Sequence, residues 1–125
     1  MDSTNNVYNT LLQALLPSEI FDYFEITQVI VNDKSLDVHL DELNIIPSLY
    51  SNKTHSSKGF QKAVVIQDFP IRERAVFLHV RRRKWLIEST GKIISRDWDT
   101  VEKGTRYTKG FASFLKGLFG QLPTE

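Results

Sequence analysis

The segment AVFLHVRRRKWL, residues 75–86, in which an apolar strand runs into four consecutive cations, limits what this chain can fold into more than any other feature. Successive side chains of a β-strand point to opposite faces of a sheet. The alternation therefore predicts a strand with one buried face, formed by Val76, Leu78 and Val80. The other face would mix rings with cations, a combination that nucleic-acid backbones and bases can use. It comprises Phe77, His79, Arg81, Arg83 and Trp85.

Four consecutive cations, residues 81–84, end this apolar strand. Arg82 and Lys84 fall on the apolar side of the alternation, so the strand either leaves the core there or is turned by a bulge. Adjacent cations repel one another and are tolerated where water or an anionic partner screens them. The run therefore has two interpretations, a solvated strand end or a surface that binds nucleic acid.

Positive charge is concentrated in the second half of the chain, although the formal net charge is only +1. Residues 1–52 contain one cation and eight acids, whereas residues 53–109 contain fourteen cations and six acids. This division suggests that one part of the protein faces an anion while another part shields it or meets a different partner.

The absence of cysteine excludes disulfides, thiol catalysis and cysteine-based zinc sites. The three histidines, His39, His55 and His79, lack metal-ligand spacing, so we expect structural or surface roles for them and no cofactor. No run of about 18 apolar residues could span a membrane. The first ten residues, MDSTNNVYNT, do not resemble a signal peptide. We therefore expect a cytoplasmic protein without a membrane partner.

The remaining periodicities predict helices at the two ends of the chain and strands between them. An N-terminal helix capped by Ser3 or Thr4 would end at Pro17. We expect its apolar stripe to pack on the core, and a helix that binds a partner is the less favoured alternative. That stripe consists of Val7, Leu11, Ala14 and Leu15. Strands are expected at residues 24–31, 36–41 and 60–68, from residue 72 onward, and at 84–88 and 92–96. Residues 44–59 would form a polar loop.

These elements predict an α+β fold with a small, mostly antiparallel sheet of five or six strands. We expect residues 1–104 to form this domain, with Trp98 as a core plug, and residues 105–125 to form an amphipathic helix and tail. Thr108 would cap the C-terminal helix, whose apolar stripe must be covered by the sheet, another chain or a following domain. The stripe consists of Phe111, Phe114, Leu115 and Leu118.

Three successive segments carry a family resemblance: DFPIRERAVFLHVRRRKWL, GKIISRDWD and GTRYTKGFASFLKGL. They resemble the N-terminal region of bacterial insertion-sequence transposases that begin with a zinc-ribbon-like domain. More narrowly, the chain is similar to the short, separately encoded transposase N-region proteins of Bacteroides-type bacteria. The similarity covers residues 68–118, and the N-terminal helix and hairpin agree with the family only in their order.

The resemblance implies a DNA-binding region that precedes a distant catalytic domain. The family holds zinc with two cysteine pairs, but here the corresponding segments read IIPSLYSNK and RRKWLIESTGK. We therefore expect a degenerate, metal-free zinc-ribbon-like region in which Trp85, Phe77 and Leu86 pack in place of the ion. The positions that match the family motif are Asp68, Phe69, Pro70, Arg81, Arg82 and Arg83. The resemblance assigns DNA binding to the arginines, whereas Asp68 and Pro70 would shape the turn.

Two functions are compatible with these features. As the non-catalytic N-terminal region of a transposase, the chain would bind DNA at the ends of its element. The phosphate-binding residues would be Arg72, Arg74, Arg81, Arg82, Arg83, Lys84, Lys92 and Arg96. Alternatively, the chain is an assembly module that docks on a separate transposase catalytic subunit or on a second copy. The docking element would be the C-terminal stripe or the acidic hairpin formed by the strands expected at residues 24–31 and 36–41. If the guanidinium groups instead pair with the chain's own acids and leave no continuous positive surface, the DNA-binding hypothesis fails and a scaffold role replaces it.

We do not expect an enzyme, because transposition chemistry of this type needs three well-placed carboxylates that hold two metal ions. Asp97, Asp99 and Glu102 are close in the sequence, but such triads normally draw residues from distant strands and helices. We interpret these three acids as solvated turn residues.

Overall fold

The predicted alternating strand is β5 (Arg74–Arg81), and it ends within the basic run. The computed structural model describes residues 3–98, 100–102 and 104–123. In β5 the side chains of Val76, Leu78 and Val80 are fully buried, as the alternation predicts. The chain leaves β5 at Arg82 and begins β6 (Arg83–Ile87) in a different sheet. The basic run is therefore the point at which the chain passes from one sheet to the other.

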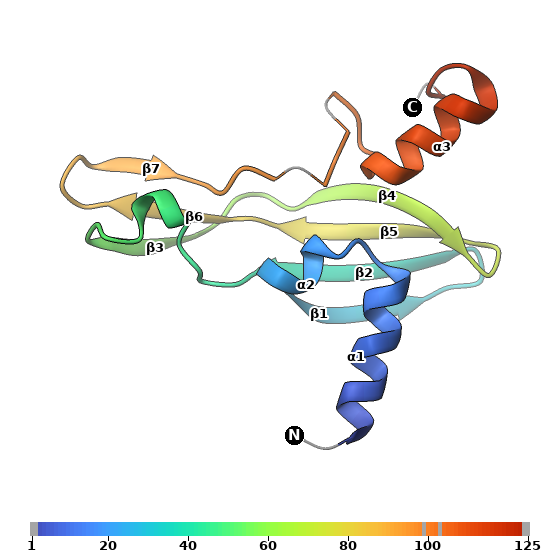
Figure 1. Cartoon of the computed structure of the whole chain (residues 1–125), viewed down its shortest axis with the longest axis horizontal. Helices are drawn as coiled ribbons and strands as arrows, with labels where there is room; N and C mark the ends of the chain where they lie inside the picture. The colour runs from blue at the N-terminus through green and yellow to red at the C-terminus, as the bar shows by residue number, and fades with distance from the viewer. Residues whose placement is uncertain (1–2, 99, 103, 124–125) are drawn as a thin grey trace.

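The two sheets follow one another along the longest axis of the molecule (Figure 1). The larger sheet has the strand order β1-β2-β5-β4, with β1 (Phe24–Val31), β2 (Ser35–Glu42) and β4 (Val64–Ile71). Its β2 and β5 are parallel, and its other neighbouring strands are antiparallel. The smaller sheet has the antiparallel order β3-β6-β7, with β3 (His55–Phe60) and β7 (Lys92–Ile94).

The α+β class and a helix near each end of the chain are confirmed. The expectation of one sheet with five or six strands is wrong, because the described residues form seven strands in two sheets. The missed strand is β3, which lies in the expected loop together with the 3-10 helix η1 (Ser48–Tyr50). The sequence of β3, HSSKGF, is polar and lacks the β-branched residues that mark a strand. Backbone pairing with β6 makes it a strand, with a register shift between Ser57 and Phe60.

The core of the larger sheet is covered on one face by α2 (Glu19–Tyr23), as Figure 1 shows. Ile20 of this helix is fully buried against the β-strand core, and Leu16 and Phe24 pack beside it. Trp98 packs against the same core, with its ring 5.5 Å from that of Phe24, which confirms its predicted place as a core plug. The smaller sheet has a separate core of Trp85, Ile87 and Ile94, with Ile46 and Tyr50 packed on it.

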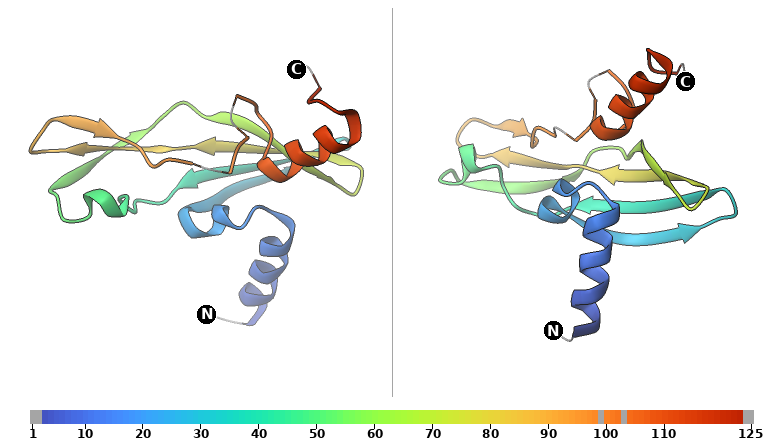
Figure 2. Two further views of the ribbon diagram at one scale, coloured as in Figure 1. Left: turned by 45° about the horizontal axis from the view of Figure 1, so that its top comes forward. Right: turned by 45° about the vertical axis from the view of Figure 1, so that its right-hand side comes forward.

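The N-terminal helix α1 (Ser3–Leu15) extends away from both sheets (Figures 1 and 2). Its predicted apolar stripe of Val7, Leu11, Ala14 and Leu15 is exposed, so the expectation that the stripe packs on the core is wrong. The core next to α1 is instead covered by Leu16 and by Ile20 of α2. Among the helices described, none has both the length and the apolar character needed to cross a membrane.

The C-terminal helix α3 (Lys109–Phe119) forms where predicted, but Thr108 does not cap it with its side chain. The Thr108 hydroxyl instead donates a hydrogen bond of 2.8 Å to Asp68 Oδ1, and both residues are buried. Asp68 thus fixes the start of α3 to β4. The strand β4 also continues through Pro70 to Ile71, with a register shift after Asp68, instead of ending at the proline.

Candidate functional site

Residues 81–84, the predicted phosphate-binding run, lie at the joint between the two sheets. Arg81 ends β5, Arg82 is the single residue between the strands, and Arg83 and Lys84 begin β6. Because the chain changes sheets here, the side chains make different sets of contacts instead of forming one row.

Arg81 is bound to an acid of its own sheet. Its Nε and Nη2 donate hydrogen bonds of 2.7 and 2.6 Å to the two carboxylate oxygens of Asp41, which lies opposite it on β2. The hydrogen bond from Arg81 lowers the pKa of Asp41 below its ordinary value, and burial opposes this effect. The Arg81 guanidinium also lies over the ring of Phe60, 4.2 Å from the centroid. Its charge is therefore largely balanced within the protein, although the side chain is 48% exposed.

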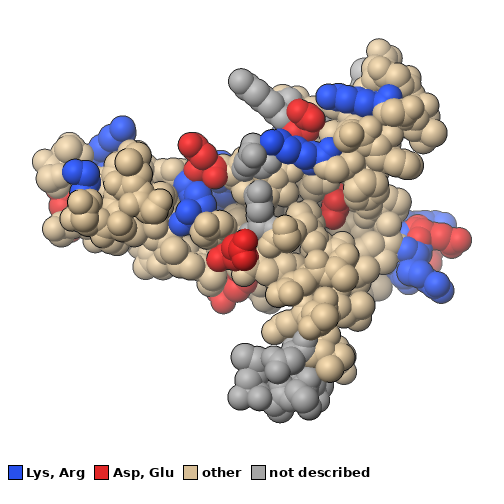
Figure 3. All heavy atoms as spheres, in the orientation of Figure 1, with Lys and Arg blue, Asp and Glu red and all other residues tan. Residues whose placement is uncertain are grey.

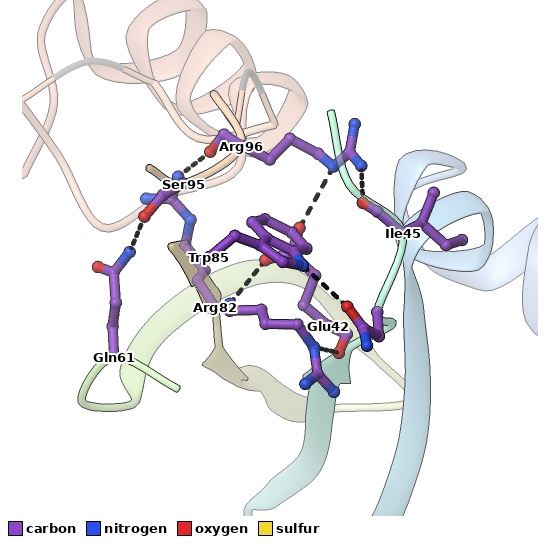
Figure 4. Close-up of polar contacts among 9 residues, drawn as sticks. Glu42, Ile45, Gln61, Arg82, Trp85, Ser95 and Arg96 are labelled. Carbon is purple, nitrogen blue, oxygen red and sulfur yellow. Dashed lines mark hydrogen bonds and ion pairs between the residues drawn. The ribbon is translucent and has the colours of Figure 1, made fainter. Parts of the chain in front are cut away.

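Glu42, a buried acid at the end of β2, is the centre of the joint (Figure 4). Its Oε1 accepts a hydrogen bond of 2.8 Å from the backbone N–H of Arg83, and its Oε2 accepts one of 3.3 Å from Nε of Arg96. Its backbone carbonyl accepts a further bond of 3.2 Å from Arg83 Nε. A buried carboxylate is stable only when such donors satisfy it. Glu42 therefore connects the larger sheet to β6 and to the segment after β7.

The other arginines of the joint also bind protein groups. Arg82 donates from Nη2 to the carbonyl of Arg96, and Arg96 donates from Nη2 to the carbonyl of Ile45 (Figure 4). The Arg96 guanidinium lies 4.0 Å from the ring centroid of Tyr23. Arg83 donates from Nη1 to Ser57 Oγ at 2.8 Å. Three of the predicted phosphate-binding arginines thus have a structural role that the sequence did not indicate.

The smaller sheet is packed at its centre by Trp85, whose indole N–H donates a 2.8 Å hydrogen bond to Asn44 Oδ1. Trp85 was expected on the cation-bearing face, but the change of sheet buries it completely. Phe77 does not join it, since Phe77 belongs to the larger sheet, and Leu86 is only half-buried. The core of the smaller sheet therefore consists of Trp85, Ile87 and Ile94, and of the three residues expected to pack together it contains only Trp85.

The remaining predicted cations are far from one another. Arg72 and Arg74 lie at the β4–β5 turn, at the opposite end of the long axis from Lys92 at the β6–β7 hairpin (Figure 1). Arg74 donates a 2.7 Å hydrogen bond from Nε to the carbonyl of Asn32. On the face drawn in Figure 3, Lys and Arg side chains form separate groups, with Asp and Glu between several of them. The eight candidate residues therefore do not form one continuous ridge.

Charge is instead divided between the two sheets. The strands β3, β6 and β7 contain four cations and no acid, namely Lys58, Arg83, Lys84 and Lys92. The strands of the larger sheet contain two cations, Arg74 and Arg81, and five acids. Those acids are Glu25, Asp37, Asp41, Glu42 and Asp68. Sequence reasoning missed this division because β5 and β6 are separated by only one residue.

The open face of the larger sheet carries a polar cluster. His79 lies 2.7 Å from Asp37 through Nε2 and Oδ1, and the rings of His79 and His39 stack at 4.3 Å. The hydrogen bond from His79 is the main cause that lowers the pKa of Asp37. Among the residues described, no group of His, Asp and Glu side chains is arranged to hold a metal ion.

Of the three acids considered as a catalytic triad, the structure describes Asp97 and Glu102. Asp97 is exposed, and Glu102 lies 3.7 Å from the Lys116 ammonium group. Asp99 lies outside the described residues.

The predicted partner-binding stripe on α3 is split between the core and the surface. Phe111 and Leu115 are buried, whereas Phe114 and Leu118 are 52% and 62% exposed. Phe69 contacts both parts of the stripe, with ring distances of 5.3 Å to Phe111 and 5.7 Å to Phe114. Only the outer half of the stripe is open to a partner.

Comparison of the chain with protein-family models, curated proteins and solved structures finds no match. The resemblance to transposase N-terminal regions therefore stays a prediction from the sequence.

Proposed function

We propose that this chain is the non-catalytic N-terminal region of a transposase and that it binds DNA through the smaller sheet. The observation that carries the proposal is the charge of this sheet, whose strands contain four cations and no acid. Lys53 and Lys62, on either side of β3, add positive charge, whereas Glu88, directly after β6, is an exposed acid. An excess of positive charge on these strands attracts the phosphates of DNA and releases their counterions.

The packing of the smaller sheet supports its interpretation as a metal-free zinc-ribbon-like region. The family carries cysteine pairs in two segments, one before and one after the basic strands. Here Ile46 and Tyr50 from the first segment pack on Trp85 and Ile87 from the second. An apolar cluster thus joins the two segments that a zinc ion would join in the family.

The fold also changes which residues the proposal uses. Arg81 is paired with Asp41, and Arg83 and Arg96 are bound at Glu42, so these guanidinium groups are poor candidates for phosphate contacts. Such pairing counts against the ridge predicted from the sequence. We assign the phosphate contacts instead to Lys58, Lys84 and Lys92, because the side chains of these lysines have no partner among the residues described.

A salt titration of DNA affinity tests the proposal with a matched pair of variants. The first variant carries Lys58→Gln, Lys84→Gln and Lys92→Gln. The control carries Lys34→Gln, Arg72→Gln and Arg74→Gln at the opposite end of the molecule, so both lose three charges. Fluorescence anisotropy with a labelled mixed-sequence duplex gives the affinity, and a duplex with the element ends tests sequence preference.

If about five phosphates are engaged, log affinity should fall with log salt concentration at a slope of about −4.5. The lysine variant should retain about two contacts and a slope of about −1.8, while the control keeps the original slope. A slope near zero for the unmodified chain, or an equal loss in both variants, would refute DNA binding by the smaller sheet.

A second candidate function, assembly, is favoured by the exposed stripe of α1. Val7, Tyr8 and Leu11 are each more than half exposed, and Leu15 is 44% exposed. The sequence of α1, STNNVYNTLLQAL, contains no charged residue, so two copies of it would meet without like-charge repulsion. Of the two partners considered, a second copy of the chain therefore fits this helix better than a charged subunit surface.

Light scattering during size-exclusion chromatography tests this candidate. The chain should dimerise as its concentration rises, and Val7→Glu with Leu11→Glu should keep it monomeric. Asn9→Glu with Gln13→Glu introduces the same charge on exposed polar positions of α1 and should leave the dimer intact. A monomer at every concentration would exclude self-association, and a shift only with the catalytic polypeptide would favour that partner instead.

A further inference from the structure

A cleft of about 330 Å³ is lined by residues of β4, by Arg82 at the joint between the sheets and by the segment that contains Trp98. Three of its lining residues are cations that the chain brings together from distant positions: Lys62, Arg82 and Arg106. None of its described lining residues is an acid. Its size is at the lower end of small-ligand sites, which enclose roughly 300–1,000 Å³.

The cations of this cleft have hydrogen-bonding capacity that the protein does not use. Lys62 and Arg106 are exposed, and their side chains have no partner among the residues described. Arg82 uses one donor for the Arg96 carbonyl, and a guanidinium group has five N–H donors. Arginine forks and lysine ammonium groups are the side chains that bind phosphate oxygens.

The wall of the cleft also contains an unexplained polar group. Trp98 lines it, and the indole N–H of Trp98 is buried and has no hydrogen-bond partner among the residues described. Buried N–H donors normally have partners, so an acceptor that enters the cleft and reaches this N–H would satisfy it. By contrast, the hollow at the β4–β5 turn contains Lys34, Arg72 and Arg74 but is balanced by Asp33 and Glu73.

We infer that the cleft binds a phosphate group. Three cations that line one cleft, with no acid among its described lining residues, repel one another, and an anion between them relieves the repulsion. The phosphate can belong to a nucleic-acid strand that continues from the smaller sheet, or it can be a free phosphate group. The first source rests on the proposed function, whereas the second does not.

The two tryptophans of the chain provide the test, because each gives one indole N–H signal in a ¹H–¹⁵N correlation spectrum. The Trp98→Phe variant assigns the signals. Titration with inorganic phosphate, at constant ionic strength against chloride, should shift the Trp98 signal in a saturable manner. The Trp85 signal should stay in place, because its N–H is bound to Asn44, and it reports that the fold is intact.

Lys62→Gln with Arg106→Gln should weaken phosphate binding at least tenfold, whereas Lys34→Gln with Arg72→Gln should not change it. Both pairs remove two exposed cations, and neither pair includes Arg82, which holds the joint. The inference fails if the Trp98 signal does not saturate, if both indole signals move alike, or if the cleft variant binds phosphate as well as the unmodified chain.

A short DNA duplex in place of inorganic phosphate identifies the source. If the duplex shifts Trp98 and the cleft variant weakens duplex binding, the phosphate belongs to DNA. If only inorganic phosphate shifts Trp98, the cleft is a site for a free phosphate group. A failure of the proposed function can be told apart from a failure of this inference. In the first case, the variant with Lys58, Lys84 and Lys92 replaced would bind DNA like its control, while the Trp98 signal would still respond to phosphate.

Discussion

Replacing Glu42 with glutamine tests whether this buried acid holds the two sheets together. In the native protein its carboxylate is 2% exposed and accepts hydrogen bonds from the Arg83 backbone and from Arg96. The glutamine amide can still accept from Arg83. It loses the negative charge, however, and its NH₂ group would face another donor if it turned toward Arg96.

The expected loss can be worked out from the exposure of the partners. Removing one member of a fully buried ion pair costs about 3–5 kcal/mol. The Arg96 side chain is 16% exposed, so water can partly solvate it after the change. A hydrogen bond to a charged group contributes about 1.5–3 kcal/mol. We therefore expect Glu42→Gln to lower the free energy of unfolding by about 2–3 kcal/mol.

Asp41→Asn, at the neighbouring residue, is the matched control. Asp41 also pairs with an arginine, but the Arg81 side chain is 48% exposed. Exposed pairs contribute about 0–1 kcal/mol, so the control should cost at least about 1 kcal/mol less than Glu42→Gln. Urea unfolding followed by circular dichroism and tryptophan fluorescence measures both changes. Equal losses in the two variants would show that Glu42 is not the centre of the joint.

Three further predictions follow from other parts of the structure. The pKa values of Asp37 and Asp41 are lowered in the fold, mainly by hydrogen bonds from His79 and Arg81 respectively. The stability that these two acids contribute is therefore present above the ordinary aspartate pKa of 3.8 and is lost as the pH falls through the lowered values. Asp37→Asn with Asp41→Asn should therefore reduce the loss of stability measured in urea titrations below about pH 4; an unchanged acid dependence would contradict this. In the β4–β5 turn, Arg72 and Glu73 have positive φ angles of 52° and 69°, which asparagine and glycine adopt more easily. Arg72→Asn with Glu73→Gly should therefore raise the free energy of unfolding by about 1 kcal/mol. A lower thermal midpoint would refute that reasoning. Asp68→Ala should lower the free energy of unfolding by about 1–3 kcal/mol and speed amide hydrogen exchange in α3, because Thr108 loses its buried acceptor. Asp68→Asn keeps an acceptor and should cost less. Unchanged exchange in α3 would show that Asp68 does not anchor the helix.

The sequence by itself determined most of the local elements of this protein, although not β3, whose polar sequence gives no strand signal. The alternation around Val76, Leu78 and Val80 correctly predicted a strand with one buried face, because alternation follows from the geometry of a single strand. The spacing of Phe111 and Leu115 likewise predicted α3. The same local signals could not show that the stripe of α1 stays exposed, since a stripe does not identify the surface that covers it.

Only the tertiary structure decided what the basic run does. Glu42 receives hydrogen bonds from Arg83 and Arg96, which are 41 and 54 positions away in the sequence, and no spacing rule connects residues so far apart. The change of sheet at Arg82 buries Trp85 and turns expected phosphate ligands into structural donors. A cation in the sequence has a charge but no assigned partner, and its partner is set by the packing of distant strands.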